Sequence, residues 1–185
     1  IPLRLVGSEM CIRDRMEIDA ATRRNLELTQ TMSGDRKGSL LSAVDKTLTG
    51  GGARLLASRI AAPLMDPKQV NARLDLVSTF YADTSARDDL RTLLKSIPEF
   101  ARALSRVTLE RAGPRDIAAI RTGLSVAEKI KAALREMPTI SLSQDLPEIL
   151  TDLVGHEALL DELNRAMVAE PSVSLNDSGF IDRGY

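Results

Sequence analysis

The residue types that most often carry out catalysis or bind metals are scarce in this sequence. Its 185 residues include one Cys, one His and no Trp. A single Cys and a single His exclude a disulfide framework and a metal centre built from several Cys or His ligands. Aromatic residues make up 3% of the chain, which argues against a base-stacking surface for single-stranded nucleic acid. Any chemistry must therefore come from short local motifs.

Two glycine-containing segments have residue types that suit a phosphate-binding loop. In residues 34–39, which read GDRKGS, Lys37 precedes the last glycine, whereas a P-loop needs its Lys directly after that glycine. We therefore interpret this segment as a polar turn between two helices. Residues 50–52 are three glycines whose backbone N–H groups could bind an anion at a helix start. We favour a tight turn or a close helix contact for them, because glycine permits both.

The single His and the neighbouring carboxylates do not form a recognisable catalytic group. His156 stands beside Glu157 in a Leu-rich helical segment, and no Ser or Cys nucleophile lies at a spacing that ties it to His156. We interpret His156 as a surface or interface residue. The pairs Asp88 with Asp89 and Asp161 with Glu162 are adjacent in sequence, so on a helix they point about 100° apart. They are expected to be solvated charges.

Arg23 and Arg24 form an Arg pair that could contact phosphate. A single Arg pair in a slightly acidic chain more often caps a helix or forms ion pairs, and we favour that role. We thus expect no catalytic, cofactor-binding, metal-binding or DNA-binding residue in this chain.

The net charge of the chain also argues against nucleic-acid binding. The chain has 25 Lys and Arg against 26 Asp and Glu, which gives a formal net charge of -1. Such a chain has no global attraction to nucleic acid or to an acidic membrane. Its hydrophobic content of 43% is sufficient for a folded core, and its length corresponds to about one domain.

The first fifteen residues differ from the rest of the chain. The apolar run over residues 1–6 is too short to span a membrane and lacks the features of a signal peptide. Residues 9–15 back-translate into a sequence that looks like the transposon-end adapter of sequencing libraries. We therefore predict that residues 1–15 are not native and that the true chain begins near Met16; a disordered tail is the alternative. Without them the chain has no Cys and a net charge of −2.

Apolar residues spaced near 3.6 predict helices over most of residues 19–170. Asp66 before Pro67, Ser85 three residues before Asp88, and Gly113 before Pro114 have the patterns of helix starts. The helix after Pro114 is expected to run about 23 residues, or about 35 Å. Its apolar stripe is Ile117, Ile120, Leu124, Ala127, Ile130 and Leu134. A stripe on the helix after Asp66 is Val70, Leu74, Val77 and Tyr81, with Phe80 alongside it.

The remaining pattern completes an all-α prediction. A last helical stretch covers residues 146–169 and is interrupted at Gly155, whose flexibility disfavours helix. Residues 172–175 and 179–181 have the pattern of a short β-hairpin. Short connections between near-continuous helices predict an all-α bundle or array. The predicted core residues are Leu55, Leu56, Leu74, Val77, Leu104, Ile117 and Leu124.

One run of residues is far more specific than these patterns. Residues 16–28, which read MEIDAATRRNLEL, resemble the opening of the core domain of the MutS family of DNA mismatch-repair ATPases. Further motifs follow in the family's order: residues 38–41 (GSLL), 45–49 (DKTLT), 52–56 (GARLL), 63–66 (PLMD), 73–75 (RLD), 104–106 (LSR), 114–116 (PRD), and Pro171 with residues 179–185 (GFIDRGY). The resemblance covers essentially all of residues 16–185.

This resemblance implies a part of a larger machine. Residues 16–185 are expected to be a partial core, or lever, domain that stops before the DNA-gripping clamp. The lever connects the ATPase to the DNA-binding domains and needs no catalytic side chain of its own. Asp19 is expected to cap the helix that carries residues 22–28. Arg23, Arg24 and Arg115 are expected to form ion pairs between domains.

The same resemblance implies the partners of the parent protein. The parent is expected to bind ATP with Mg²⁺ at a site outside this chain, and no cofactor is expected here. It is expected to bind mismatched double-stranded DNA and a MutL-like partner, to form a homo-oligomer, and to work in the cytoplasm away from membranes. Two other functions stay open: a stand-alone helical module that docks a partner helix, and an enzyme with an unrecognised site.

Overall fold

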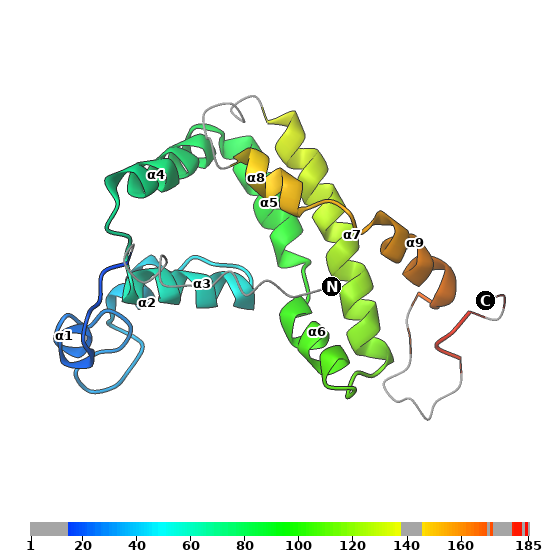
Figure 1. Cartoon of the computed structure of the whole chain (residues 1–185), viewed down its shortest axis with the longest axis horizontal. Coiled ribbons are helices and arrows are strands. Elements are labelled where there is room, and N and C mark those ends of the chain that lie inside the picture. The colour runs from blue at the N-terminus through cyan, green and yellow to red at the C-terminus, as the bar shows by residue number, and fades with distance from the viewer. Residues whose placement is uncertain (1–14, 138–145, 170, 172–178, 183, 185) are drawn as a thin grey trace, which may run out of the picture. The chain divides into compact units, whose positions relative to one another are not determined.

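The computed structural model describes residues 15–137, 146–169, 171, 179–182 and 184, and the structural account is confined to them. Within these residues the chain forms helices, most of them joined by short connections, with a longer loop over residues 26–39, two isolated β-bridges and no longer strand (Figure 1). The all-α prediction is therefore confirmed. The helices are α1 (Ala20–Asn25), α2 (Leu40–Val44), α3 (Gly50–Ala61), α4 (Pro67–Ala82), α5 (Thr84–Lys95), α6 (Phe100–Thr108), α7 (Pro114–Glu136), α8 (Leu146–Asp152) and α9 (Glu157–Ala166).

The chain divides into two compact units, Ile1–Leu74 and Asp75–Tyr185, which are described separately. Residues 1–14 lie outside the described residues, so the structure does not test the expectation that the first fifteen residues are not native. The first unit has little core of its own. Among its described residues only Ser39 and Leu41 are buried.

Helix α1 begins where its sequence predicts and ends early. The Asp19 carboxylate accepts a hydrogen bond from the Thr22 backbone N–H at 2.9 Å, which confirms Asp19 as the N-cap. The expected continuation to residue 28 is wrong, because Glu27 adopts a left-handed backbone with φ of 47°. Glu27 instead accepts the Leu40 N–H at its carbonyl, which joins the turn after α1 to the start of α2.

The core predicted for α3 is not observed. Leu55 is exposed and Leu56 is half-buried, so the assignment of Leu55 to a core is wrong. In the described part of the first unit, α3 contacts α2, which is only five residues long, so little of its apolar face is covered.

Helix α4 begins at Pro67, and Asp66 accepts the Lys68 N–H at 3.0 Å, as its sequence predicts. All four residues of the predicted stripe are exposed: Val70, Leu74, Val77 and Tyr81. The Leu74 side chain is 56% exposed and that of Tyr81 is 79% exposed. Leu76 and Phe80 pack against the core instead. These residues lie about 100° round the helix from Val77 and Tyr81, so the periodicity was right and the face was wrong.

The start of α5 corrects a second prediction. The N-cap is Asp83, whose carboxylate accepts the Ala86 N–H at 3.0 Å, and not Ser85, which lies inside the helix. Asp and Ser are both good N-caps. Asp83 caps the helix because α4 ends at Ala82 and leaves this residue in an extended conformation.

Helix α7 organises the second unit and has the 23 residues predicted for it. Its predicted stripe is confirmed: Ile120, Leu124 and Leu134 are buried. One end of the helix builds a core with Leu90 of α5, Met137 and Leu146 of α8. The other end builds a core with Ala103 of α6, flanked by Leu160 and Leu163 of α9.

Helix α6 packs on α7 through small residues. Ala103 is buried, whereas Leu104 is exposed, so the assignment of Leu104 to the core is wrong. The reason is a close approach of the two helices, in which Phe100 lies against Gly123 of α7. Ile117 is half-buried and packs against the same core.

The last helical stretch is interrupted as predicted. Helices α8 and α9 flank Gly155, whose φ is 90°. Residues 172–175 of the predicted hairpin lie outside the described residues. Ile181 forms an antiparallel bridge with Met167, directly after α9.

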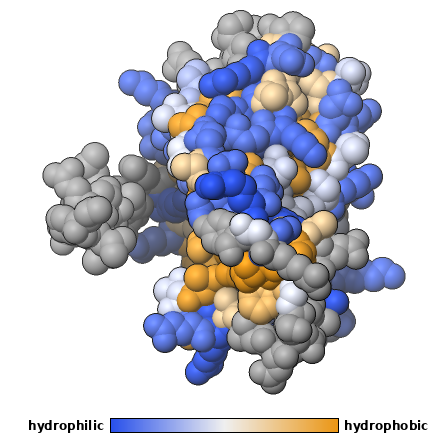
Figure 2. Space-filling view, turned by 90° about the vertical axis from the view of Figure 1, so that its right-hand side faces the viewer, coloured by the Kyte–Doolittle hydropathy of each residue, from blue (hydrophilic) through white to orange (hydrophobic). Residues whose placement is uncertain are grey.

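The second unit also leaves apolar side chains exposed. Leu104, Leu109 and Leu159 are among them. Figure 2 shows apolar residues in several places on the visible face, with the largest group in its lower half. Such gathered apolar surface marks an interaction site more often than scattered single residues do.

Candidate functional site

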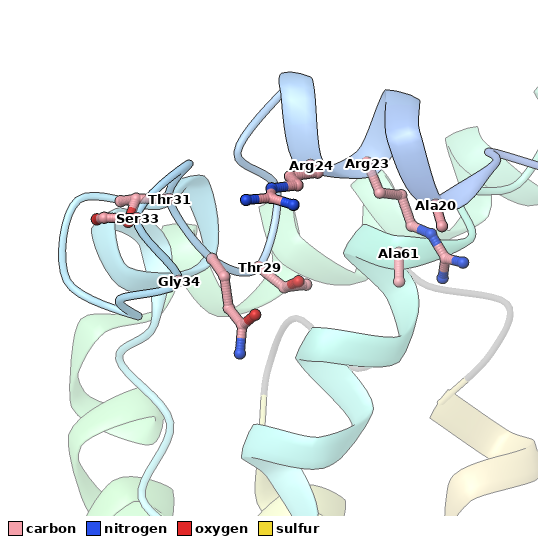
Figure 3. Close-up of a pocket in the computed structure, with 9 residues that line it drawn as sticks. Ala20, Arg23, Arg24, Thr29, Thr31, Ser33, Gly34 and Ala61 are labelled. Atoms are coloured by element: carbon pink, nitrogen blue, oxygen red, sulfur yellow. The ribbon is translucent and has the colours of Figure 1, made fainter.

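Arg23 and Arg24 both line a cavity in the first unit (Figure 3). It has a volume of about 350 Å³. Its lining residues are Ala20, Arg23, Arg24, Thr29, Gln30, Thr31, Ser33, Gly34 and Ala61. Figure 3 shows the two guanidinium groups pointing away from each other. The two cations therefore do not converge on one anion.

The two arginines are engaged differently. Arg24 donates a hydrogen bond from Nη2 to the Met32 carbonyl at 3.1 Å and so holds the loop after α1. The Arg23 side chain has no hydrogen-bond or ion-pair partner among the residues that the structure describes. The predicted pairing between domains stays a prediction for both residues.

Residues 34–39 form a polar turn, as predicted from the position of Lys37 before Gly38. Gly34 and Gly38 have φ of 91° and 100°, a region in which glycine has no steric penalty. Ser39 then caps α2 by accepting the Ser42 N–H. Arg36 forms an ion pair with Asp45, and hydrogen bonds from Thr47 lower the pKa of the Asp45 carboxyl. The segment stabilises a loop and shows no phosphate cradle.

Residues 50–52 form the first turn of α3. The Thr49 hydroxyl accepts the Gly52 N–H at 3.0 Å, so the cap is supplied by the chain itself. A Cβ on Gly52 would lie 3.0 Å from that hydroxyl, which explains why a residue without a side chain suits this close contact.

The candidate acid–base residues are dispersed. His156 is exposed and directly precedes α9 without capping it through its side chain. Asp161 and Glu162 both pair with Arg165, at 3.2 and 3.0 Å, on the same exposed helix. In the part of the chain that is described, no three His, Cys, Asp or Glu residues gather in a way that could hold a metal ion.

The length and hydropathy of the helices bear on membrane association. Across the described ranges, none of them combines the length and apolar character that crossing a bilayer requires.

The start of α7 is held by a group of polar contacts. Asp116 accepts the Gly113 N–H at 2.8 Å and pairs with Arg106 of α6 at 3.1 Å. Arg115 is exposed, and within the described residues its side chain has no partner. Sequence reasoning proposed Arg115 as an ion-pair partner and missed Arg106, because nothing in the local pattern distinguishes one surface Arg from another.

A buried cation joins α7 to α9. Lys131 is 8% exposed, and its Nζ lies 3.2 Å from both Glu128 on its own helix and Glu157 on α9. The bond with Glu157 raises the pKa of Lys131. The pKa of Glu157 is lowered, first by its own backbone N–H and then by Lys131. Sequence reasoning missed Lys131, since its partner lies 26 residues away.

These contacts connect α7 to the neighbouring helices α6 and α9. α7 spans about 35 Å, and helices α5, α6 and α9 all contact it. Charged side chains at separate positions along α7 bind neighbouring elements, so the described part of this unit is built around one long helix.

Comparison with known proteins gives the context of this arrangement. A family model described as MutS domain III matches residues 21–183. The DNA mismatch repair protein MutS of Paracoccus denitrificans is 49% identical over 170 residues, which cover 92% of this chain and 19% of the relative. The proteins of the same name from Cereibacter sphaeroides and a Ruegeria species are 51% and 48% identical, with the same coverage.

The chain therefore spans about 19% of the length of the curated relatives it matches. The family model covers most of the chain, and the motifs named above fall within the matched residues or directly beside them. With its all-helical architecture and these matches, the chain belongs to the MutS domain III family.

Proposed function

We propose that this chain is part of a longer MutS-like DNA mismatch repair protein, in which residues 16–185 form the first part of the lever domain. The observation that carries the proposal is the match of residues 21–183 to MutS domain III. The short coverage of the relatives supports a partial protein, and we propose that residues 1–15 are not native.

In this proposal the chain transmits displacement and performs no chemistry. α7 and the helices packed on it supply a stiff element, and a stiff element links two distant sites better than a loop does. ATP with Mg²⁺ would be bound by another part of the longer protein, as would mismatched double-stranded DNA. For the longer protein we propose, on the same family relationship, a MutL-like partner, a homo-oligomeric assembly and a cytoplasmic location.

A chimera tests the proposal. Residues 16–185 would replace the matching segment of the Paracoccus denitrificans MutS, and the chimera would be expressed in a strain that lacks its own MutS. The expected result is a mutation rate within about tenfold of that given by the intact relative, because about half of the exchanged residues are identical.

The control is the same chimera with Leu134→Asp, which places a charge in the core of the exchanged segment. This control should leave the mutation rate at the level of the strain without MutS. A chimera that is expressed and folded but gives no repair would refute the proposed function.

A further inference from the structure

Arg121 makes an unusual set of contacts from the middle of α7. Its Nη1 donates to the carbonyls of Met167 and Val168 at 3.2 and 3.0 Å, and its Nη2 donates to the carbonyl of Ala169 at 2.7 Å. One guanidinium thus binds three consecutive backbone carbonyls that lie 46 to 48 residues further along the chain.

The segment that Arg121 binds is itself paired. Val168 donates its N–H to the Phe180 carbonyl at 3.2 Å, and Asp182 donates to the Ala166 carbonyl at 2.9 Å. These two bonds flank the bridge between Met167 and Ile181. Arg121 therefore holds, through residues 167–169, a second segment that it does not bind directly.

The chemistry of this position suits Arg specifically. The three carbonyls belong to residues 167–169, directly after α9, which ends at Ala166, so a cation that binds them lies near the negative end of the helix dipole. Arg presents several N–H groups in a fixed planar fork, whereas Lys presents a single point charge. An Arg can thus bind adjacent carbonyls at once, and its charge is favourable beside the end of α9.

The opposite end of α9 is also bound to α7. Glu157, the first residue of α9, pairs with Lys131. Arg121 and Lys131 are ten residues apart, so they lie about 15 Å apart along the axis of α7. Helix α9 is consequently attached to α7 by a cation at each end.

We infer that Arg121 is a latch that makes the paired segments after α9, residues 166–168 and 180–182, move with α7 as one body. A displacement of α7 is then passed to residues 180–182 through the three carbonyl bonds. This use of the latch in coupling rests on the proposed lever function, whereas the latch itself does not.

Hydrogen exchange on the 185-residue chain tests the latch without ATP, DNA or a partner. In Arg121→Gln the N–H groups of Val168 and Asp182 should exchange about tenfold faster or more, since the pairing they form loses its support. Leu124 should exchange at an unchanged rate, which reports that α7 and its core remain folded. Arg121→Lys should give faster exchange than the wild type, because it retains the charge and loses the fork.

Lys129→Gln is the matched control. Lys129 lies on α7 and lines the same cavity as Arg121, of about 540 Å³, so the variant removes the same charge from the same surroundings. Its exchange at Val168 and Asp182 should equal that of the wild type. Unchanged exchange of Val168 and Asp182 in Arg121→Gln, or wild-type protection of them in Arg121→Lys, would overturn the inference. So would exchange in Lys129→Gln that is as fast as in Arg121→Gln. Faster exchange of Leu124 in Arg121→Gln would also overturn it. The chimera of the preceding section could fail while the latch holds, so the two claims fail separately.

Discussion

At the scale of single residues, Gly123 sets how closely α6 approaches α7. A Cβ at this position would lie 2.6 Å from the Cδ2 atom of Phe100, closer than Cβ atoms pack in proteins. The contact partner is an aromatic ring that is itself packed against the core, so the ring cannot simply swing away. The helix pair depends on the absence of a side chain here.

Gly123→Ala is therefore expected to destabilise the protein by about 1–3 kcal/mol, as overpacking of cores typically does. Urea unfolding, followed by circular dichroism, measures the change. Gly51→Ala serves as the control, because a Cβ on Gly51 meets no atom nearer than the Arg54 guanidinium at 4.0 Å. Equal stability of wild type and Gly123→Ala would mean that the close approach is not as described.

Leu74 and Leu134 allow an exposed leucine to be compared with a buried one. Leu134 is 4% exposed and Leu74 is 56% exposed. Leu134→Ala should cost about 2–5 kcal/mol, as truncation of a core leucine does, and Leu74→Ala should cost less than about 1 kcal/mol. Urea unfolding of both variants provides the comparison. A cost at Leu74 that matches the cost at Leu134 would show that the face of α4 carrying Leu74 is covered.

At the scale of elements, the caps decide where helices begin. Asp83→Ala should destabilise by about 1 kcal/mol through loss of the bond to the Ala86 N–H. Ser85→Ala is the matched control and should change the stability by less than about 0.5 kcal/mol, because Ser85 lies inside α5. Thermal unfolding distinguishes the two. The reverse order of effects would restore Ser85 as the cap.

The link between α7 and α9 should depend on pH at both extremes. The pKa of Glu157 in the folded protein lies below its ordinary value of 4.5, so its contribution is complete above that pH and is lost as the pH falls below it. The pKa of Lys131 lies above its ordinary value of 10.5, so its contribution is complete below that pH and is lost above it.

Amide exchange across α9, followed from pH 3 to neutral, checks the acid side of this prediction. The protection of α9 should fall at acid pH in the wild type, and Glu157→Gln should remove much of that dependence. Glu162→Gln, which alters an exposed carboxylate of the same helix, should retain it. A pH dependence unaffected by Glu157→Gln would contradict the assigned role of the Lys131 pair.

The elements also show how far sequence reasoning reached. The length and buried stripe of α7 were predictable because Pro114 marks its start and its apolar residues meet helices on several sides. The buried face of α4 was not predictable. Both Val77 and Leu76 are apolar, and only the position of Leu90 and its neighbours decides which one is covered. Arg121 and Lys131 were missed because their partners are distant in sequence.

At the scale of the whole molecule, the match of residues 21–183 to MutS domain III supports the proposed lever role. The family relationship was predictable from ordered motifs such as residues 16–28, which are specific where composition is not. The role of Arg23 in an ion pair between domains stays a prediction, because its partner would lie in another part of the longer protein. The proposed lever role therefore depends on coupling between the ATPase and the DNA-binding domains of that longer protein.

The most direct test is nucleotide-dependent release of DNA by the purified chimera that carries residues 16–185 within the Paracoccus denitrificans MutS. Release of a mismatched duplex on addition of ATP and Mg²⁺ would be followed by fluorescence anisotropy, with the 185-residue chain alone as the control that binds neither ligand. The lever account predicts release within about tenfold of the rate of the intact relative. A chimera that binds both ATP and the duplex but does not release the duplex on ATP addition would contradict it.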